Sequence, residues 1–286
     1  MDQRIIELYD EYTHAPLPRR VFLTRLTALV GSAAAATALL PLLENRYAHA
    51  AIVAETDARI ATSRIAYPGA TGEVRGYMAM PRAGGRYGAV IVIHENRGLN
   101  PHIEDVARRL AVEGFLAMAP DALSPMGGTP ADEDMARDMI GRLDAGQTSN
   151  NFLAAVPWMR DHGHGNGKVG CVGFCWGGAM ANQLAVRSGH LAAAVSYYGR
   201  QPDANQVAGL SSPLLLQYAG LDTRINAGID AFVAALREHR KPFEMHVYEG
   251  VNHAFNNDTN AARYNEPAAR LAWQRTLAFL RMHLTA

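Results

Sequence analysis

The chain of 286 residues carries 27 basic and 27 acidic side chains, and 49% of its residues are hydrophobic. The balanced charge and the absence of a basic tract remove the electrostatic basis for a nucleic-acid partner, and we expect none. The length and the hydrophobic content suffice for one large domain with its own core. The two cysteines, Cys171 and Cys175, are too few for a disulfide framework in a chain of this length.

The first fifty residues have the three parts of an export signal. The pair Arg19 and Arg20 comes first, and the apolar, alanine-rich run LTALVGSAAAATALLPLL follows it. The small-residue pattern Ala48-His49-Ala50 comes last. A charged region, an apolar region and a small-residue site in this order are typical of a signal that directs a protein to the export machinery.

The arginine pair and the aromatic and aliphatic residues after it resemble a twin-arginine translocation signal, from which Pro18 and Thr24 depart. We predict that residues 1–50 are cleaved off after Ala50. Residues 51–286 would then form the mature domain in the bacterial periplasm, or the protein would stay in the cytoplasm if the signal does not function. The alternative is a retained membrane anchor, but the run is short for a spanning helix.

Apolar strands alternate with amphipathic helices after residue 51. The alternation in 73–81 predicts a strand, and the continuous apolar runs 87–95, FLAMAPDAL, 168–174, LAAAVSYYG and PLLLQYAG predict buried strands, with KPFEMHVYEG as the last strand. Helices are predicted over PHIEDVARRLAVEGF, over 131–162 with a break near DAGQT, over 176–187, over 226–239 and over 261–284.

Strands that alternate with helices predict a mostly parallel sheet covered on both faces, which is a single three-layer α/β domain. No internal repeat interrupts this pattern after residue 51. Such sheets hold their reactive side chains at the carboxyl ends of the strands, so the residues directly after each predicted strand are the candidates for a functional site.

One of these strand ends has the form of a nucleophile elbow. The segment Gly173-Phe174-Cys175-Trp176-Gly177 joins a buried strand directly to a helix, with cysteine where many hydrolases have serine. The glycines allow neighbouring backbone to approach closely, and the start of a helix favours a thiolate. The pattern predicts a nucleophilic Cys175, and the alternative is a structural cysteine in a tightly packed turn.

Two further strand ends carry the partners that such a nucleophile needs. Asp222 follows the strand PLLLQYAG, and His253 follows the last predicted strand. Taken singly, Asp222 could cap a helix that begins at Thr223, and His253 is one of 11 histidines. Taken together with Cys175, they stand in the order nucleophile, acid, histidine that is found in α/β-hydrolases, and this favours a catalytic triad.

The motifs GFCWGG, YAGLD, VNHAF and HENRG resemble those of the dienelactone hydrolase family, and the resemblance covers nearly all of residues 60–286. It implies an α/β-hydrolase fold and hydrolysis of an ester or lactone through a triad of Cys175, His253 and Asp222. The thiolate would attack the carbonyl, and water would then hydrolyse the thioester. We expect neither a metal nor a cofactor.

The resemblance also implies that Glu95 contacts the nucleophile and holds the resting thiol until substrate arrives. A carboxylate beside a thiol has this effect because like charges repel. The alternative is a surface acid paired with Arg97. The main-chain N–H groups of Trp176 and Asn96 are the predicted oxyanion hole.

One position departs from the family pattern. Family members carry an arginine shortly after the catalytic histidine that binds a substrate carboxylate, and here Asn257 stands near that place. Arg263, Arg137 and Arg142 could replace it, but none matches the motif. The sequence therefore does not identify an anionic dienelactone as the substrate.

Two other functions compete with the hydrolase. A non-catalytic ligand-binding member of the same fold would keep the pocket without turnover. A thiol-redox protein would use Cys171 and Cys175, but the C-x-x-C spacing of such proteins is absent. The neighbouring His162 and His164 have no further ligands at metal-site spacing, and we interpret them as a polar turn.

Overall fold

The computed structural model describes residues 1–15, 17–47 and 51–285, so the predicted cleavage site at residues 48–50 lies outside the described residues. The described strands form one eight-stranded sheet in the order β1-β2-β4-β3-β5-β6-β7-β8. β1 and β2 are antiparallel to their neighbours, and β3 to β8 run parallel. The strands are β1 (Ile60–Gly69), β2 (Gly72–Pro81), β3 (Tyr87–Ile93), β4 (Leu116–Pro120), β5 (Gly165–Phe174), β6 (Ala193–Tyr197), β7 (Leu214–Ala219) and β8 (Phe243–Tyr248).

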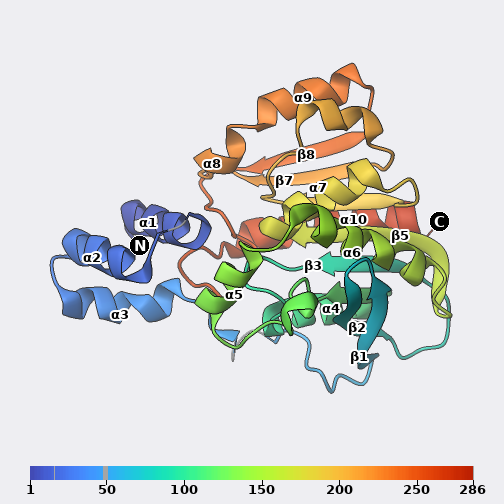
Figure 1. The fold of residues 1–286 in the computed structure, drawn as a ribbon, viewed down its shortest axis with the longest axis horizontal. Coiled ribbons are helices and arrows are strands. Elements are labelled where there is room, and N and C mark those ends of the chain that lie inside the picture. The colour runs from blue at the N-terminus through green and yellow to red at the C-terminus, as the bar shows by residue number, and fades with distance from the viewer. Residues whose placement is uncertain (16, 48–50, 286) are drawn as a thin grey trace.

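Helices cover both faces of this sheet, as Figure 1 shows. α4 and α10 pack on one face, and α6 and α7 pack on the other. This confirms the predicted α/β architecture with a mostly parallel sheet. The helices after the first strand are α4 (Pro101–Val112), α5 (Glu133–Ile140), α6 (Ala145–Arg160), α7 (Trp176–Arg187), α8 (Thr223–Asn226), α9 (Ile229–Glu238) and α10 (Glu266–Leu284), and two short 3₁₀ helices span Ser124–Met126 and Ala204–Gly209.

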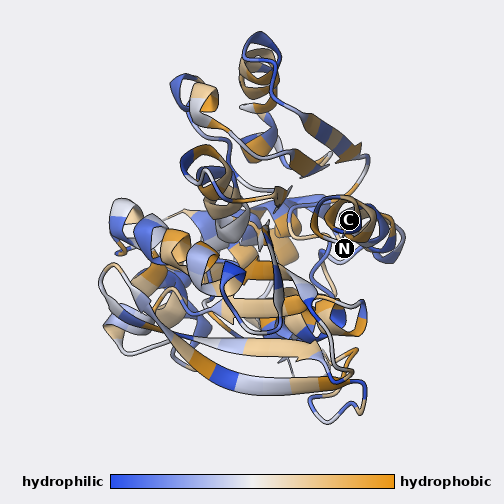
Figure 2. Ribbon diagram, turned by 90° about the vertical axis from the view of Figure 1, so that its right-hand side faces the viewer, coloured by the Kyte–Doolittle hydropathy of each residue, from blue (hydrophilic) through white to orange (hydrophobic). Residues whose placement is uncertain are grey.

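The hydrophobic pattern explains where the core lies. All residues from Ala89 to Ile93 in β3 are fully buried, as expected for a strand covered on both faces. In Figure 2 the central strands show mainly hydrophobic colours, whereas the helices carry hydrophilic residues as well. The hydrophobic core therefore lies on both faces of the central strands.

Helix boundaries follow the capping residues more closely than the hydrophobic pattern. The predicted helix 261–284 begins only at Glu266, because Asn265 caps it by accepting from the N–H of Ala268. The predicted helix 226–239 corresponds to α9, which begins only at Ile229, and the short helix α8 precedes it. The break expected near DAGQT is confirmed, since Asp144 caps α6.

Three further helices precede the sheet, namely α1 (Gln3–His14), α2 (Arg19–Val30) and α3 (Ala33–Leu43). They enclose a small apolar core of their own that includes Tyr9, Phe22 and Leu26, and Figure 1 shows them grouped at one side of the sheet. Within the described residues no single helix is long and apolar enough to cross a membrane. α2 and α3 together reach the length and composition of a span, but a bend of 112° separates them.

Candidate active site

The elbow after β5 presents a cysteine in a strained turn. Cys175 has φ 56° and ψ −113°, a conformation that side-chain-bearing residues rarely adopt, and α7 begins directly after it. A Cβ atom on Gly173 would lie 1.9 Å from the carbonyl oxygen of Gly177, and one on Gly177 would lie 2.3 Å from that of Ile93. Both glycines are therefore required for strand and helix to meet at this angle.

The other two predicted triad residues meet beside this turn. Nδ1 of His253 lies 2.5 Å from Oδ2 of Asp222, whose Oδ1 accepts a hydrogen bond from the N–H of Ile225. Because a carboxylate only accepts, the proton of the ring is on Nδ1. Nε2 of His253 is buried and has no hydrogen-bond partner among the described residues. The ring thus directs an unoccupied nitrogen towards the pocket that holds Cys175.

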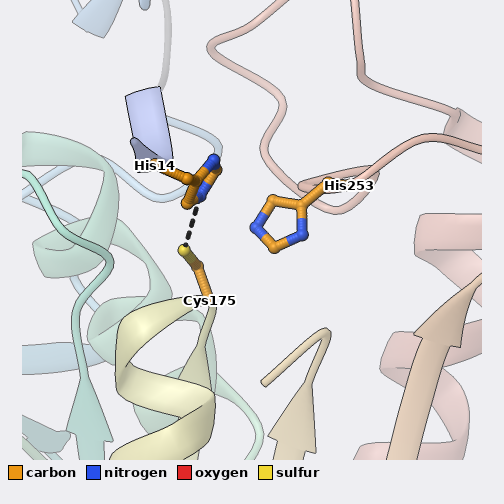
Figure 3. A group of neighbouring side chains, drawn as sticks. All are labelled: His14, Cys175 and His253. Carbon is orange, nitrogen blue, oxygen red and sulfur yellow. Dashed lines mark hydrogen bonds between the residues drawn. The ribbon is translucent and has the colours of Figure 1, made fainter. Parts of the chain in front are cut away.

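A second imidazole, which the sequence analysis did not anticipate, contacts the sulfur. Nε2 of His14, the last residue of α1, lies 3.1 Å from Sγ of Cys175. The reactive atoms of His14, Cys175 and His253 all lie within 4.8 Å of one another, and Figure 3 shows the two rings on adjacent sides of the thiol. The ring centroids of the two histidines are 4.6 Å apart at an angle of 76°.

The charges in this cluster stabilise a thiolate. Burial by itself would raise the pKa of the Cys175 thiol, but His14 and His253 outweigh it and lower that pKa to about 6. Burial opposes protonation of His253, but Cys175, Asp10 and Asp222 together raise its pKa to about 10. The pKa of His14 is also raised, because Cys175 and Asp10 outweigh its burial. These shifts favour a thiolate at Cys175 and a protonated ring at His253 at neutral pH, and they favour protonation of His14.

The spacing of His14, Cys175 and His253 would also admit a metal ion, since thiolate and imidazole are ligands of soft cations. A strained elbow carries the sulfur, and Asp222 accepts from the ring of His253, which is an arrangement that acyl-transfer enzymes also use.

Glu95 is buried at the end of β3, where its Oε2 accepts a hydrogen bond of 2.8 Å from the amide of Asn257. Arg97 pairs instead with Asp134, at 3.2 Å. The alternative of a surface acid paired with Arg97 is therefore wrong. The restraint of the resting thiol by Glu95 stays a prediction, since the sulfur contacts His14.

Trp176 and Asn96, the predicted oxyanion-hole residues, both line the cleft beside Cys175. The ring of Trp176 stacks on that of His94, with centroids 5.3 Å apart. The side-chain amide of Asn96 donates to the carbonyl oxygen of Thr13, at 2.7 Å. The role of their main-chain N–H groups stays a prediction.

The cleft above the sulfur has a volume of about 1130 Å³ and a cationic lining. Two of the arginines considered from the sequence, Arg137 and Arg142, line it, whereas Arg263 is buried behind His14 and stacks on Tyr9. The full set of arginines along the cleft is Arg137, Arg142, Arg187, Arg200 and Arg224.

The remaining sequence candidates lie away from the cluster. Cys171 is fully buried inside β5, where burial raises the pKa of its thiol to about 12, and both cysteines are free. The two sulfurs are thus no redox pair in this structure. His162 and His164 lie in the turn before β5, with ring centroids 5.8 Å apart.

His14 and its partner Asp10 were missed because residues 1–50 were interpreted as a signal. One feature of the sequence points the other way. The first eighteen residues contain four acidic side chains and a single basic one, Arg4, whereas the start of an export signal is typically basic. The amphipathic pattern of this stretch forms α1, with Ile5, Leu8 and Tyr9 on its buried face.

Comparisons with known proteins show the family and the fold of this chain. The model of the dienelactone hydrolase family matches residues 74–284. A "Putative carboxymethylenebutenolidase" of Yersinia pestis is 31% identical over 226 residues, which cover 74% of this chain and 84% of that protein. A protein of the same name from Methylorubrum extorquens is 28% identical, and the match covers 93% of this chain and 96% of that protein. Residues 51–286 make up less than 93% of this chain, so the match extends into the first fifty residues.

Among solved structures, a "Putative Dienelactone Hydrolase" from Klebsiella pneumoniae superposes with a TM-score of 0.70 at 30% identity. The superposition covers 77% of this chain and 98% of that one.

Proposed function

We propose, because the chain belongs to the dienelactone hydrolase family, that it hydrolyses a small ester or lactone through a thioester on Cys175. The family makes the chain a hydrolase of ester or lactone bonds. The observation that carries the finer proposal is the position of Cys175 on a strained elbow, within 4.8 Å of the ring nitrogen of His253, which Asp222 orients.

The reaction would proceed in two halves. Sγ of Cys175 attacks the carbonyl carbon, and the negative charge that forms on the oxygen faces the main-chain N–H groups of Trp176 and Asn96. Nε2 of His253 donates its proton to the alkoxide as the carbon–oxygen bond breaks. In the second half the neutral ring takes a proton from water, hydroxide attacks the thioester, and the carbon–sulfur bond breaks to restore the thiolate.

The lining of the cleft supports a substrate with a carboxylate. Arg142 and Arg200 line the cleft and form no ion pair with a carboxylate among the described residues. Guanidinium groups bind carboxylates with paired hydrogen bonds. The name carboxymethylenebutenolidase, borne by relatives, denotes action on a lactone that carries a carboxyl group. We therefore propose a carboxylate-bearing lactone or ester, although Asn257 replaces the arginine of the family motif.

The first experiment measures turnover of a panel of lactones and short nitrophenyl esters, each tested with and without a carboxylate, by the full chain and by Cys175→Ala. We expect the parent to turn over and the variant to fall by at least about 10³-fold, as for loss of a covalent nucleophile. Equal activity of both proteins would refute the thioester. Binding of the panel without any turnover would favour a ligand-binding protein.

The substrate class has its own test. Each of the variants Arg142→Gln and Arg200→Gln should raise KM about tenfold for a substrate with a carboxylate. KM for the matching substrate without the carboxylate should stay unchanged, because only the charged substrate loses an ion pair. An equal change for both members would argue against a carboxylate subsite.

A further inference from the structure

We propose that His14, carried by the N-terminal helix α1, is a catalytic residue: its imidazolium holds Cys175 as a thiolate and stabilises this thiolate as it leaves the thioester. The inference deepens the proposed function and rests on it. It assigns residues 1–47 a part in the active site.

Each histidine is anchored at Nδ1 by an oxygen of an aspartate residue. Nδ1 of His14 lies 2.9 Å from the main-chain carbonyl oxygen of Asp10 and 3.1 Å from its Oδ1. Nδ1 of His253 lies 2.5 Å from Oδ2 of Asp222. In each ring an aspartate fixes the proton on Nδ1, so Nε2 is the nitrogen that faces Cys175. The sulfur thus lies between two aspartate–histidine pairs that come from opposite ends of the chain.

Hydrogen bonds from other elements that line the site hold α1 in position. The amide of Asn96 donates to the carbonyl oxygen of Thr13 at 2.7 Å, and the guanidinium of Arg137 donates to that of Tyr12 at 3.2 Å. At the other end of the helix, the side-chain amide of Gln3 donates to the side-chain oxygen of Asn252 at 2.7 Å. Asn252 is the residue before His253.

The rest of the segment is fastened to the same side of the domain. The guanidinium of Arg263 stacks on the ring of Tyr9, and the main-chain N–H of Arg46 donates to the carbonyl oxygen of Thr259 at 2.8 Å. Contacts at both ends of the segment therefore hold the ring of His14 at the sulfur.

The segment forms a wall of the cleft and leaves the cleft open. Thr13, His14 and Ala15 line the same space of about 1130 Å³ as Cys175 and Trp176. Cys175 itself lines this space while α1 is docked, and a space of this size holds a small ester or lactone. The contact is therefore compatible with turnover.

The geometry gives the imidazole rings of His253 and His14 different roles. His253 Nε2 has no hydrogen-bond partner among the described residues and is free to pass a proton to the leaving alkoxide and to take one from water. His14 Nε2 is occupied by the sulfur and keeps its proton throughout. A fixed positive charge beside Sγ lowers the free energy of the thiolate before attack and again when the carbon–sulfur bond breaks.

The charged surroundings favour a protonated His14. Asp10 is a carboxylate whose pKa lies well below its usual range, because His253, His14 and Arg263 outweigh its burial. Arg224 and Arg263 lie 3.8 Å and 3.7 Å from its carboxylate oxygens. The other titratable groups that face the sulfur and the two rings are Asp222 and Tyr198, and Glu95 acts on Tyr198.

The test measures the rate at which iodoacetamide alkylates Cys175 as a function of pH in the full chain and in His14→Gln. Cys171 is fully buried and provides no competing site. Without the imidazolium the apparent pKa of the reactive thiol should rise by at least one unit. Since each unit removes about nine-tenths of the thiolate at a pH well below the pKa, and the parent pKa is about 6, alkylation at pH 5 should slow about tenfold or more. His239→Gln, the same substitution at an exposed histidine, is the control and should match the parent.

Asp10→Asn provides a second variant in which the ring of His14 stays in place. Its thiol pKa should lie between those of the parent and His14→Gln, because the amide stabilises the imidazolium less than the carboxylate does. Comparison of the near-ultraviolet circular dichroism of each variant with that of the parent separates misfolding from loss of charge. If both folded variants keep the parent's alkylation profile, His14 has no role at the sulfur and the inference is wrong.

The outcomes distinguish this inference from the proposed function. Parent-like alkylation in His14→Gln together with an inert Cys175→Ala would overturn the role of His14 and leave the thioester mechanism intact. Activity that survives in Cys175→Ala would overturn both. A slow, alkaline-shifted alkylation profile in His14→Gln together with an inert Cys175→Ala is the result that we expect.

Discussion

Nε2 of His14 lies 3.1 Å from Sγ of Cys175, although the two residues are 161 positions apart in the chain. The N-terminal helix and the elbow after β5 therefore build one site. The contact makes the reactivity of the thiol depend on a segment that lies outside residues 74–284, which the family model matches.

The pH dependence of turnover should follow the ionisation of this cluster. The lowered pKa of Cys175, about 6, means that the nucleophilic thiolate is present above this pH and is lost below it. The raised pKa of His253, about 10, means that its proton is present below that pH and is lost above it. We expect kcat/KM to be flat between these limits and to fall about tenfold per pH unit outside them. If kcat/KM instead falls on the acidic side with a pKa near the usual value for cysteine, the ion pair is contradicted.

Asp222→Asn should lower kcat by about 10²–10⁴-fold with little change in KM, because an amide can donate to Nδ1 and favour the wrong tautomer of His253. Steady-state kinetics on the best ester of the panel measures this. The exposed Asp230, changed to Asn in the same way, should leave the rate unchanged. Wild-type kcat in Asp222→Asn would mean that this aspartate acts only as the cap of α8.

Gly177→Ala should damage both folding and turnover. Its Cβ would lie 2.3 Å from the carbonyl oxygen of Ile93, so the elbow must shift, at a cost of about 1–3 kcal/mol. A shift of the sulfur by a few tenths of an ångström should lower kcat further. Urea denaturation and kinetics measure the two effects. Gly163→Ala, where nothing lies within 4 Å of the new atom, is the matched control.

Export through the twin-arginine pair remains a prediction, and the contact of His14 gives cleavage a consequence. Removal of residues 1–50 would take away His14 and should raise the thiol pKa as His14→Gln does. The intact mass of the protein in periplasmic and cytoplasmic fractions of a host cell measures cleavage and location together. A periplasmic form that begins at Ala51 would support export, and an uncleaved cytoplasmic form would contradict it.

Local sequence determined much of this protein. The alternation of apolar runs and amphipathic helices predicts the parallel sheet, because strands buried on both faces must be apolar throughout. The glycines around Cys175 predict the elbow, since a Cβ at Gly173 or Gly177 would overlap the backbone. The strand ends at Asp222 and His253 predict two residues that the fold then brings within 2.5 Å of each other.

Only the tertiary structure decided what the N-terminal segment contacts. Hydrophobic periodicity predicts that a helix such as 3–14 buries one face, but it does not predict which surface covers that face. The pairing of Glu95 with Asn257 and of His14 with Cys175 depends on side chains that converge from distant elements. Long-range packing places these groups, and with them it determines the ionisation of the thiol.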